Sequence, residues 1–162
     1  MAEFLPALEF MLPHEGGYVL DSRDPGGETK YGISKKQYPN LDIEGLTKEQ
    51  AGEIYKKDYW YPSHAASIES QRVANKHFDQ CVNLGLKQAI KLLQRSCNDC
   101  GKVVVVDGEI GPVTLNAVNS LDGDSLVEAM KGAAIQFYQD LVARKPSLGV
   151  FLKGWENRAR EG

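Results

Sequence analysis

The sequence lacks any long apolar run. Among its 162 residues, no stretch approaches the roughly 20 apolar residues that a membrane-spanning helix needs. The opening residues, MAEFLPALEFMLPHEGG, also lack the basic segment of a secretion signal, and Glu3, Pro6 and Glu9 interrupt their apolar positions. We therefore expect a chain that is made in the cytoplasm without a signal peptide and without stable insertion into a membrane. A substrate beyond the membrane would require another component to release the protein.

Cysteine is scarce, and basic residues are not in excess. Cys81, Cys97 and Cys100 are an odd set for a disulfide framework, and without an export signal we expect them to be reduced. Cys97 and Cys100 form a CxxC, but there is no second pair, and neither His64 nor His77 has the spacing to complete a zinc site. With 22 acidic and 19 basic residues, the net charge of −3 gives no field that attracts DNA or RNA. We expect no metal, no cofactor and no nucleic-acid partner.

The chain also has no internal repeat, no low-complexity tract and no linker rich in glycine, serine or proline. Hydrophobic residues make up 42% and charged residues 25%, which is typical of a globular protein. The helical periodicity that recurs along the chain predicts a mainly α fold. We expect one compact, monomeric unit whose two halves pack together.

The first predicted helix covers residues 3–13. Its apolar positions follow helical spacing, which predicts a buried face made of Phe4, Leu5, Leu8 and Leu12. Pro13 disfavours helix at the residue before it, and Gly16 and Gly17 do not continue a helix cheaply. We therefore expect Glu15 at or just past the end of this helix, next to irregular backbone.

Further helices are predicted downstream. Thr47 and Gln50 form a capping box that opens a helix, and Pro62 is expected to end it. Helices over 67–83 and 87–97 are separated by Gly85. Residues 103–106 are β-branched and predict a short strand at best, whereas Pro112 suits the first position of another helix. Asp124 or Ser125 is expected to cap the longest helix, and a segment around FLKGWENRARE follows it.

Residues 18–34 mix turn formers with apolar positions and predict a loop or a small irregular β-hairpin. Glu15 and Asp24 stand nine positions apart, on either side of the start of this segment. One protonated carboxyl group and one ionised carboxylate are what glycoside hydrolysis needs, and Thr29 could hold the attacking water. Asp21 competes with Asp24 for the second role. On spacing alone, the ordinary alternative is that Glu15 caps or pairs locally and that both aspartates are turn residues.

The segment HEGGYVLDSRDPGGETKYGIS resembles the opening motif of glycoside hydrolase family 108, HEGGYvnDpxDpGGeTkyGIs, and departs from it mainly at Leu20 and Ser22. Members of that family are phage endolysins and related bacterial proteins. The resemblance implies a lysozyme-like fold, cleavage of the bond between N-acetylmuramic acid and N-acetylglucosamine, and Glu15 as the catalytic acid. A similarity to the Glu-Asp-Thr arrangement of phage lysozymes suggests Asp24 and Thr29 as its partners, although Thr29 falls one position early.

Downstream, HFDQCVNLGLKQAIKLLQ, VDGEIGPVTLNAV, FYQDL and FLKGW resemble the predicted peptidoglycan-binding region of that family. The expected division is a catalytic lobe over 1–70 and a peptidoglycan-binding helical region over 71–162. Asp79 and Asn83, one helical turn apart, either line the cleft or form a buried hydrogen-bonding pair. Residues 107–114 either contact glycan or serve as scaffold.

Tyr18 and Tyr31 flank the carboxylates and are candidates to contact sugar rings, whereas Trp60 and Trp155 are interpreted as packing residues. His14 is interpreted as a hydrogen-bond partner rather than a general base. Peptidoglycan is the expected partner, and a holin or an export system is a candidate for releasing the protein to the wall. The rival hypothesis is a protein that binds peptidoglycan or assists secretion without catalysis, since some relatives are named secretion activators.

Overall fold

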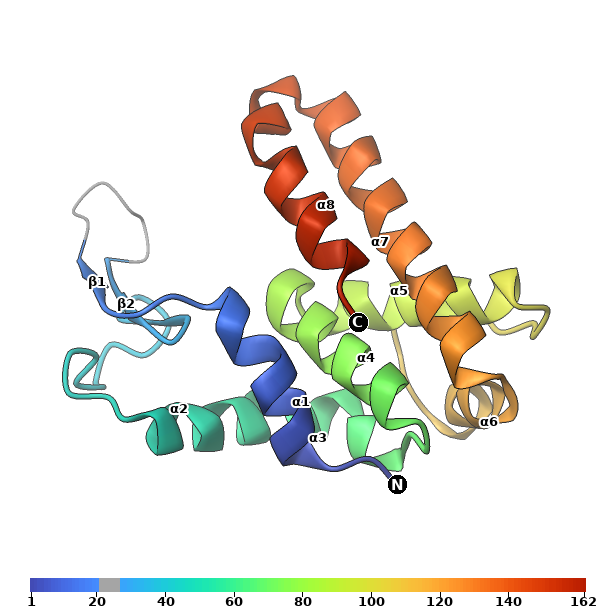
Figure 1. The fold of residues 1–162 in the computed structure, drawn as a ribbon, viewed down its shortest axis with the longest axis horizontal. Coiled ribbons are helices and arrows are strands. Elements are labelled where there is room, and N and C mark those ends of the chain that lie inside the picture. Colours follow the sequence, from blue (N-terminus) through green and yellow to red (C-terminus); the bar gives the residue numbers. More distant parts are fainter. Residues whose placement is uncertain (21–26) are drawn as a thin grey trace.

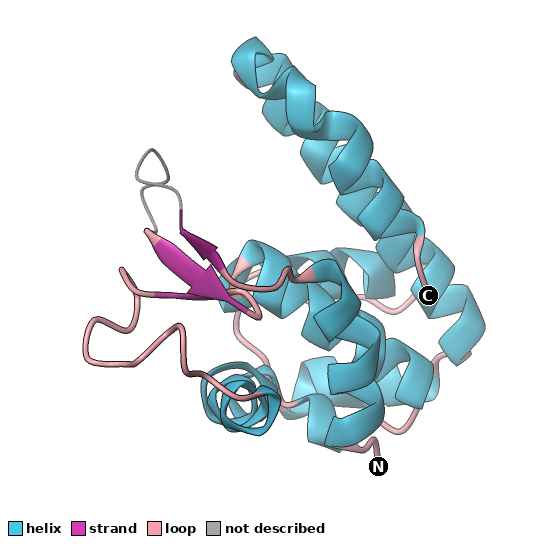
Figure 2. Cartoon of the chain, turned by 60° about the vertical axis from the view of Figure 1, so that its left-hand side comes forward, coloured by secondary structure: helices cyan, strands magenta, loops and turns pink. Residues whose placement is uncertain are grey.

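The computed structural model describes residues 1–20 and 27–162. It is mainly helical, with a small antiparallel sheet set to one side (Figures 1 and 2). The expected mainly α, lysozyme-like fold is confirmed. The α-helices are α1 (Phe4–Met11), α2 (Lys48–Tyr55), α3 (Tyr61–Ser63), α4 (Gln71–Leu84), α5 (Leu86–Asp99), α6 (Pro112–Ser120), α7 (Gly123–Arg144) and α8 (Leu152–Arg160).

Short helical segments and strands complete the chain. Three segments are 3-10 helices: η1 (Leu12–His14), η3 (Ala65–Ser67) and η4 (Pro146–Phe151). A fourth, η2 (Lys56–Trp60), is a π-helix. The strands are β1 (Val19–Leu20), β2 (Glu28–Lys30) and β3 (Ile33–Ser34), in the order β1-β2-β3.

Helix α1 buries most of the expected face, since Leu8 is buried and Phe4 and Leu12 pack against the core. Ala7, Leu8 and Met11 point into the core, whereas Leu5 is 67% exposed. The prediction for Leu5 was wrong because Ala7 and Met11, and not Leu5, complete the buried face. Against α4, with which α1 packs, a small side chain permits close approach of the two helices.

The second helical stretch begins as predicted and ends later. Thr47 accepts from the Gln50 backbone N–H, and the Gln50 side chain accepts from the Thr47 N–H, so the capping box is formed. Pro62 does not end the stretch, because α2 runs through η2 into α3, where Pro62 occupies the first turn. A proline is tolerated there, since its missing N–H is not needed for the ladder of a new helix.

Two predictions for the C-terminal half were also wrong. Residues 103–106 form no strand, and Val103 is 94% exposed. The longest helix, α7, is capped by Asp122, whose carboxylate accepts from the Ser125 N–H, and not by Asp124 or Ser125. Asp122 lies three residues before the N–H that it caps, which is the usual distance.

The core is shared by both halves of the chain. Helix α4 packs against α1, α5 and α7, and one cluster of buried side chains extends from Ala2 to Met130. At its centre Trp60 and Phe78 pack with their ring centroids 5.7 Å apart, and Phe4 contacts both rings. Trp60 is therefore a packing residue, as interpreted from the sequence.

Helices α7 and α8 form an antiparallel hairpin that projects from the body of the molecule (Figure 1). Its own small cluster contains Tyr138 and Trp155, whose rings stack at 5.0 Å between centroids. The far end of α8 returns to α4, close to the N-terminal half of the chain. Within the described ranges, no helix is both long and apolar enough to cross a membrane.

Candidate active site

Glu15 lies directly after η1. Its backbone N–H donates to the Leu12 carbonyl at 2.9 Å, and its own backbone is extended, with φ −101° and ψ 136°. The chain therefore leaves the helix at this residue, as the proline and glycines around it predicted. The side chain is 20% exposed, so the carboxyl group is reachable and yet largely shielded from water.

The turn between β2 and β3 forms one wall of the site. Tyr31 and Gly32 join the strands with φ values of +52° and +78°, as in the primed turns that suit two-residue hairpins. A Cβ atom on Gly32 would lie 2.7 Å from Glu15 Oε2, so glycine is needed both for the backbone and for space.

Hydrogen bonds from two sides fix this turn. The Tyr31 N–H donates to the Gly16 carbonyl at 3.0 Å, and the buried Tyr55 hydroxyl donates to the Tyr31 carbonyl at 2.6 Å. Burial, followed by the charge of Glu15, raises the pKa of Tyr55 well above its ordinary value. Tyr55 therefore remains a neutral donor beside the carboxylate.

The other wall comes from the C-terminal helix. Arg158 of α8 places Nη2 3.3 Å from Glu15 Oε1 and 2.9 Å from Asp79 Oδ1, and its Nε lies 3.3 Å from both Asp79 oxygens. Burial alone would lower the pKa of Arg158, but the hydrogen bonds and charges of Asp79 and Glu15 outweigh it and raise the pKa. The guanidinium therefore stays positive between two carboxylates.

The end of α8 is anchored by a buried lysine. The Lys76 ammonium group donates to the carbonyls of Arg158, at 3.1 Å, and Glu161, at 2.7 Å. Lys76 is 1% exposed, and this burial lowers the pKa of its ammonium group to about 8, although the negative charge of Asp79 opposes the shift. Lys76 thus caps the last turn of the helix that carries Arg158.

His14 adds a second contact at the end of α8. Its Nε2 lies 2.8 Å from Glu161 Oε2, which supports the interpretation of His14 as a local partner. The imidazole is also packed edge-on against Phe10, with centroids 6.2 Å apart. His14 and Lys76 therefore hold the same terminal turn from two elements.

The expected sugar-contacting and water-holding residues lie on the sheet and its turn. Tyr18 precedes β1 and donates its hydroxyl to Glu28 at 2.9 Å; this bond raises the pKa of Tyr18 to about 12. Thr29 is in β2, paired with Val19 and Ser34. A hollow of about 330 Å³ is lined by Tyr31 together with Glu15, Gly16 and Gly17.

Asp21 and Asp24, the candidates for the second carboxylate, lie outside the described residues. Asp79 and Asn83 share one face of α4 but bond different partners. Asp79 is 2% exposed and pairs with Arg158, whereas the Asn83 amide donates to the Tyr138 hydroxyl of α7. Their contact with substrate stays a prediction, and so does the role of Thr29.

Sequence reasoning missed Arg158, which stands 143 positions after Glu15. A signal was present: Leu152, Trp155 and Ala159 give α8 an apolar face, and Arg158 falls beside it. A charge on such a face needs a buried counter-charge. Asp79, next to Phe78 on the buried face of α4, meets that need.

The cysteines are free, with Cys81 and Cys97 buried and Cys100 half-buried. Burial raises the pKa of Cys97 to about 11, which makes it a poor thiolate ligand or nucleophile. Within the described ranges, no group of three or more histidine, cysteine or acidic side chains is arranged to hold a metal ion.

Comparison with known proteins identifies both parts of the chain. Residues 8–85 match the family described as Glycosyl hydrolase 108, and residues 88–160 match the family described as Predicted Peptidoglycan domain. The junction follows Gly85, where α4 ends; the expected division at residue 70 stays a prediction. No curated protein matches the chain.

A solved structure, that of SagA from Brucella abortus, is similar to this one. It has 27% sequence identity and a TM-score of 0.76, over 96% of this chain and 88% of that chain. The families relate the protein to peptidoglycan, as a hydrolase or a binder. The resemblance noted in the motif around Glu15 is thereby confirmed: the N-terminal half of the chain matches the glycosyl hydrolase 108 family, and the C-terminal half matches the predicted peptidoglycan domain.

Proposed function

We propose that the protein is an N-acetylmuramidase that cleaves the β-1,4 bond between N-acetylmuramic acid and N-acetylglucosamine, with Glu15 as general acid. The observation that carries the proposal is the placement of Glu15. Its two carboxyl oxygens face different walls, Oε1 toward Arg158 and Oε2 toward Gly32, at a largely shielded position. This arrangement fixes the orientation of one proton donor, which protonation of a leaving oxygen requires.

Glu15 meets the charges of two other side chains. Glu15, Asp79 and Arg158 together carry a net charge of −1, from two carboxylates and one guanidinium. Asp79 holds the guanidinium with the shorter contact, 2.9 Å against 3.3 Å for Glu15.

The second carboxylate is assigned to Asp24, with Asp21 as the alternative, and Thr29 is proposed to position the water. In this chemistry, carboxyl groups about 6.5–9.5 Å apart leave room for water and invert the anomeric centre, whereas a separation of about 5 Å gives retention. The anomeric form of the first product, read by NMR, distinguishes the two.

Substrate contacts are proposed for Tyr18 and Tyr31 on the sheet side of the site and for Asn83 of α4, whereas Asp79, which is 2% exposed, is proposed to act on the substrate through its partner Arg158. The catalytic lobe supplies the acid, and the peptidoglycan-binding region holds the strand. The protein would act on the cell wall after release by a holin or an export system.

Analysis of the reaction products tests the proposal. Purified peptidoglycan is digested, the new reducing ends are labelled by reduction, and the fragments are analysed by mass spectrometry. Reduced muramic acid is the expected label. A label on glucosamine alone, or release of peptides without new reducing ends, would overturn the assignment as a muramidase.

Binding without hydrolysis is the second candidate, favoured by the peptidoglycan domain that spans residues 88–160. Such a domain can hold the wall whether or not Glu15 acts. If the protein sediments with peptidoglycan and no new reducing ends form, this second function is correct.

A further inference from the structure

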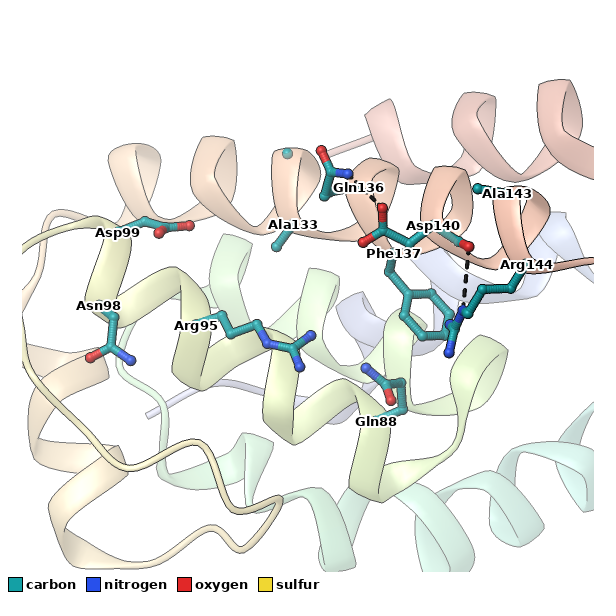
Figure 3. A pocket seen from close by; sticks show the side chains of 11 residues that line it. Gln88, Arg95, Asn98, Asp99, Ala133, Gln136, Phe137, Asp140, Ala143 and Arg144 are labelled. Atoms are coloured by element: carbon teal, nitrogen blue, oxygen red, sulfur yellow. Dashed lines mark hydrogen bonds between the residues drawn. The ribbon is translucent and has the colours of Figure 1, made fainter.

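A second hollow lies away from Glu15, between α5 and α7. The two helices pack against each other, and their side chains line a groove of about 1040 Å³ (Figure 3). Gly132, Ala133 and Ala143 leave the α7 side open, because small residues cannot fill the space between helices. The walls are consecutive turns of two packed helices, so the groove is preformed.

Charges of both signs line this groove. Arg95 and Asp99 come from α5, and Asp140 and Arg144 come from α7. Within the described parts of the chain, neither Arg95 nor Asp99 makes an ion pair, and Arg144 donates only to the Asp140 carbonyl, at 3.4 Å. Two guanidinium groups therefore have donors available to a ligand from opposite sides of the groove.

We propose that this groove binds the peptide stem of peptidoglycan, with Arg95 and Arg144 contacting carboxylates of the peptide. The proposal rests on the proposed function in one respect, that peptidoglycan is the substrate. A stem peptide carries free carboxylates and, at its diamino acid, an ammonium group. The two arginines match the carboxylates, and Asp99 and Asp140 match the ammonium group.

The glycan itself fits this groove poorly. Sugar rings stack on exposed aromatic faces, but the one aromatic residue lining the groove, Phe137, is half-buried and packs against Tyr138 with centroids 5.6 Å apart. In Figure 3, Gln88, Arg95, Phe137 and Arg144 point into the same hollow. Amide and guanidinium groups around an apolar floor suit a peptide, since they satisfy its carbonyl and carboxylate oxygens.

Titration with a synthetic stem peptide tests the inference. The probe is L-Ala-γ-D-Glu-meso-diaminopimelate-D-Ala, followed by amide chemical shifts in NMR, with tetra-alanine as the control peptide. We expect shifts at Gly132 and Ala133 and affinity at least about tenfold weaker in the Arg95→Gln/Arg144→Gln variant, since each loses charge-assisted hydrogen bonds. The matched control, Lys102→Gln/Lys153→Gln, removes two exposed charges outside the groove and should bind as the unmodified protein does.

Hydrolysis of glycan strands stripped of their peptides separates the two proposals. The groove variant should cleave stripped strands at the unmodified rate and bind intact wall less tightly. A probe that does not bind, that shifts only residues near Glu15, or that binds the groove variant equally well would overturn the inference while leaving the muramidase proposal intact. If the probe binds in the groove but no strand is cleaved, the muramidase proposal fails and the groove assignment is supported.

Discussion

Arg158 Nη2 lies 3.3 Å from Glu15 Oε1, although the two residues stand near opposite ends of the chain. Asp79 of α4 holds the guanidinium at this place. Lys76, also in α4, caps the end of α8, the helix that carries Arg158. The candidate acid therefore depends on α4 and α8 as well as on its own motif.

The Asp79–Arg158 pair is expected to be coupled. Removing one partner of a buried pair leaves an uncompensated charge, so Asp79→Asn and Arg158→Gln should each lower the free energy of unfolding by about 3 kcal/mol. The double variant should lose less than the sum, by at least about 0.5 kcal/mol, in urea denaturation. Arg160→Gln, which breaks an exposed pair with Glu156 on the same helix, should cost about 1 kcal/mol or less. Strict additivity would refute the coupling.

Lys76 predicts a pH dependence of stability. Its pKa falls from 10.5 to about 8 on folding, so between these values the unfolded chain binds more protons than the folded chain. Stability should therefore rise as the pH increases from about 8 to 10.5, by up to about 3 kcal/mol from this group. The Lys76→Met variant lacks this contribution, so the unfolding free energy of the unmodified protein should increase relative to that of the variant as the pH rises over this range. Parallel curves over that range would contradict the assignment.

Gly32 and Gly27 form a matched pair of substitutions. Both have positive φ, +78° and +69°, but only Gly32 has neighbours in the place of a Cβ, namely Glu15 and Tyr55. Each alanine variant should cost about 1–2 kcal/mol of stability through backbone strain. Gly32→Ala should in addition displace Glu15 and abolish most of the cell-wall hydrolysis, which Gly27→Ala should largely retain. Equal rates in both variants would show that close packing at Gly32 does not position the acid.

Tyr55 is expected to hold the turn beside Glu15. Tyr55→Phe removes the hydrogen bond to the Tyr31 carbonyl and should cost about 1 kcal/mol in unfolding free energy. Hydrogen exchange of the Tyr31 amide, which bonds to Gly16, should become faster. Tyr59→Phe, on a neighbouring ring 5.8 Å away, is the control and should leave that exchange unchanged. An unaffected Tyr31 amide in Tyr55→Phe would rule out this role.

The local signals in the sequence predicted the local structure well. The capping box at Thr47, the helix break at Gly85 and the helix start at Pro112 all lie where the residues placed them. The prediction that Pro62 ends the second helix was wrong, because a proline that interrupts one helix also suits the first turn of the next. The prediction of a short strand over residues 103–106 was wrong, because β-branched residues form a strand only where another strand can pair with them.

The site could be predicted only in part. The motif predicted Glu15 and the glycines because they are neighbours in sequence, and the turn at Gly32 packs directly on the acid. The pairing of Arg158 with Glu15 is set by how α8 returns to α4, and no local pattern encodes that contact. The trace it leaves in the sequence is an arginine and an aspartate that each lie beside apolar positions of a helix.

The role of Glu15 as general acid is tested by the rate at which the Glu15→Gln variant forms new reducing ends in purified peptidoglycan. This variant keeps the size of the side chain and removes the transferable proton. The exposed Glu69→Gln serves as the control, and circular dichroism verifies folding of both. The account predicts a loss of at least about 100-fold for Glu15→Gln, as expected for removal of a general acid, and an unchanged rate for Glu69→Gln. Equal rates for Glu15→Gln and the unmodified protein would contradict it.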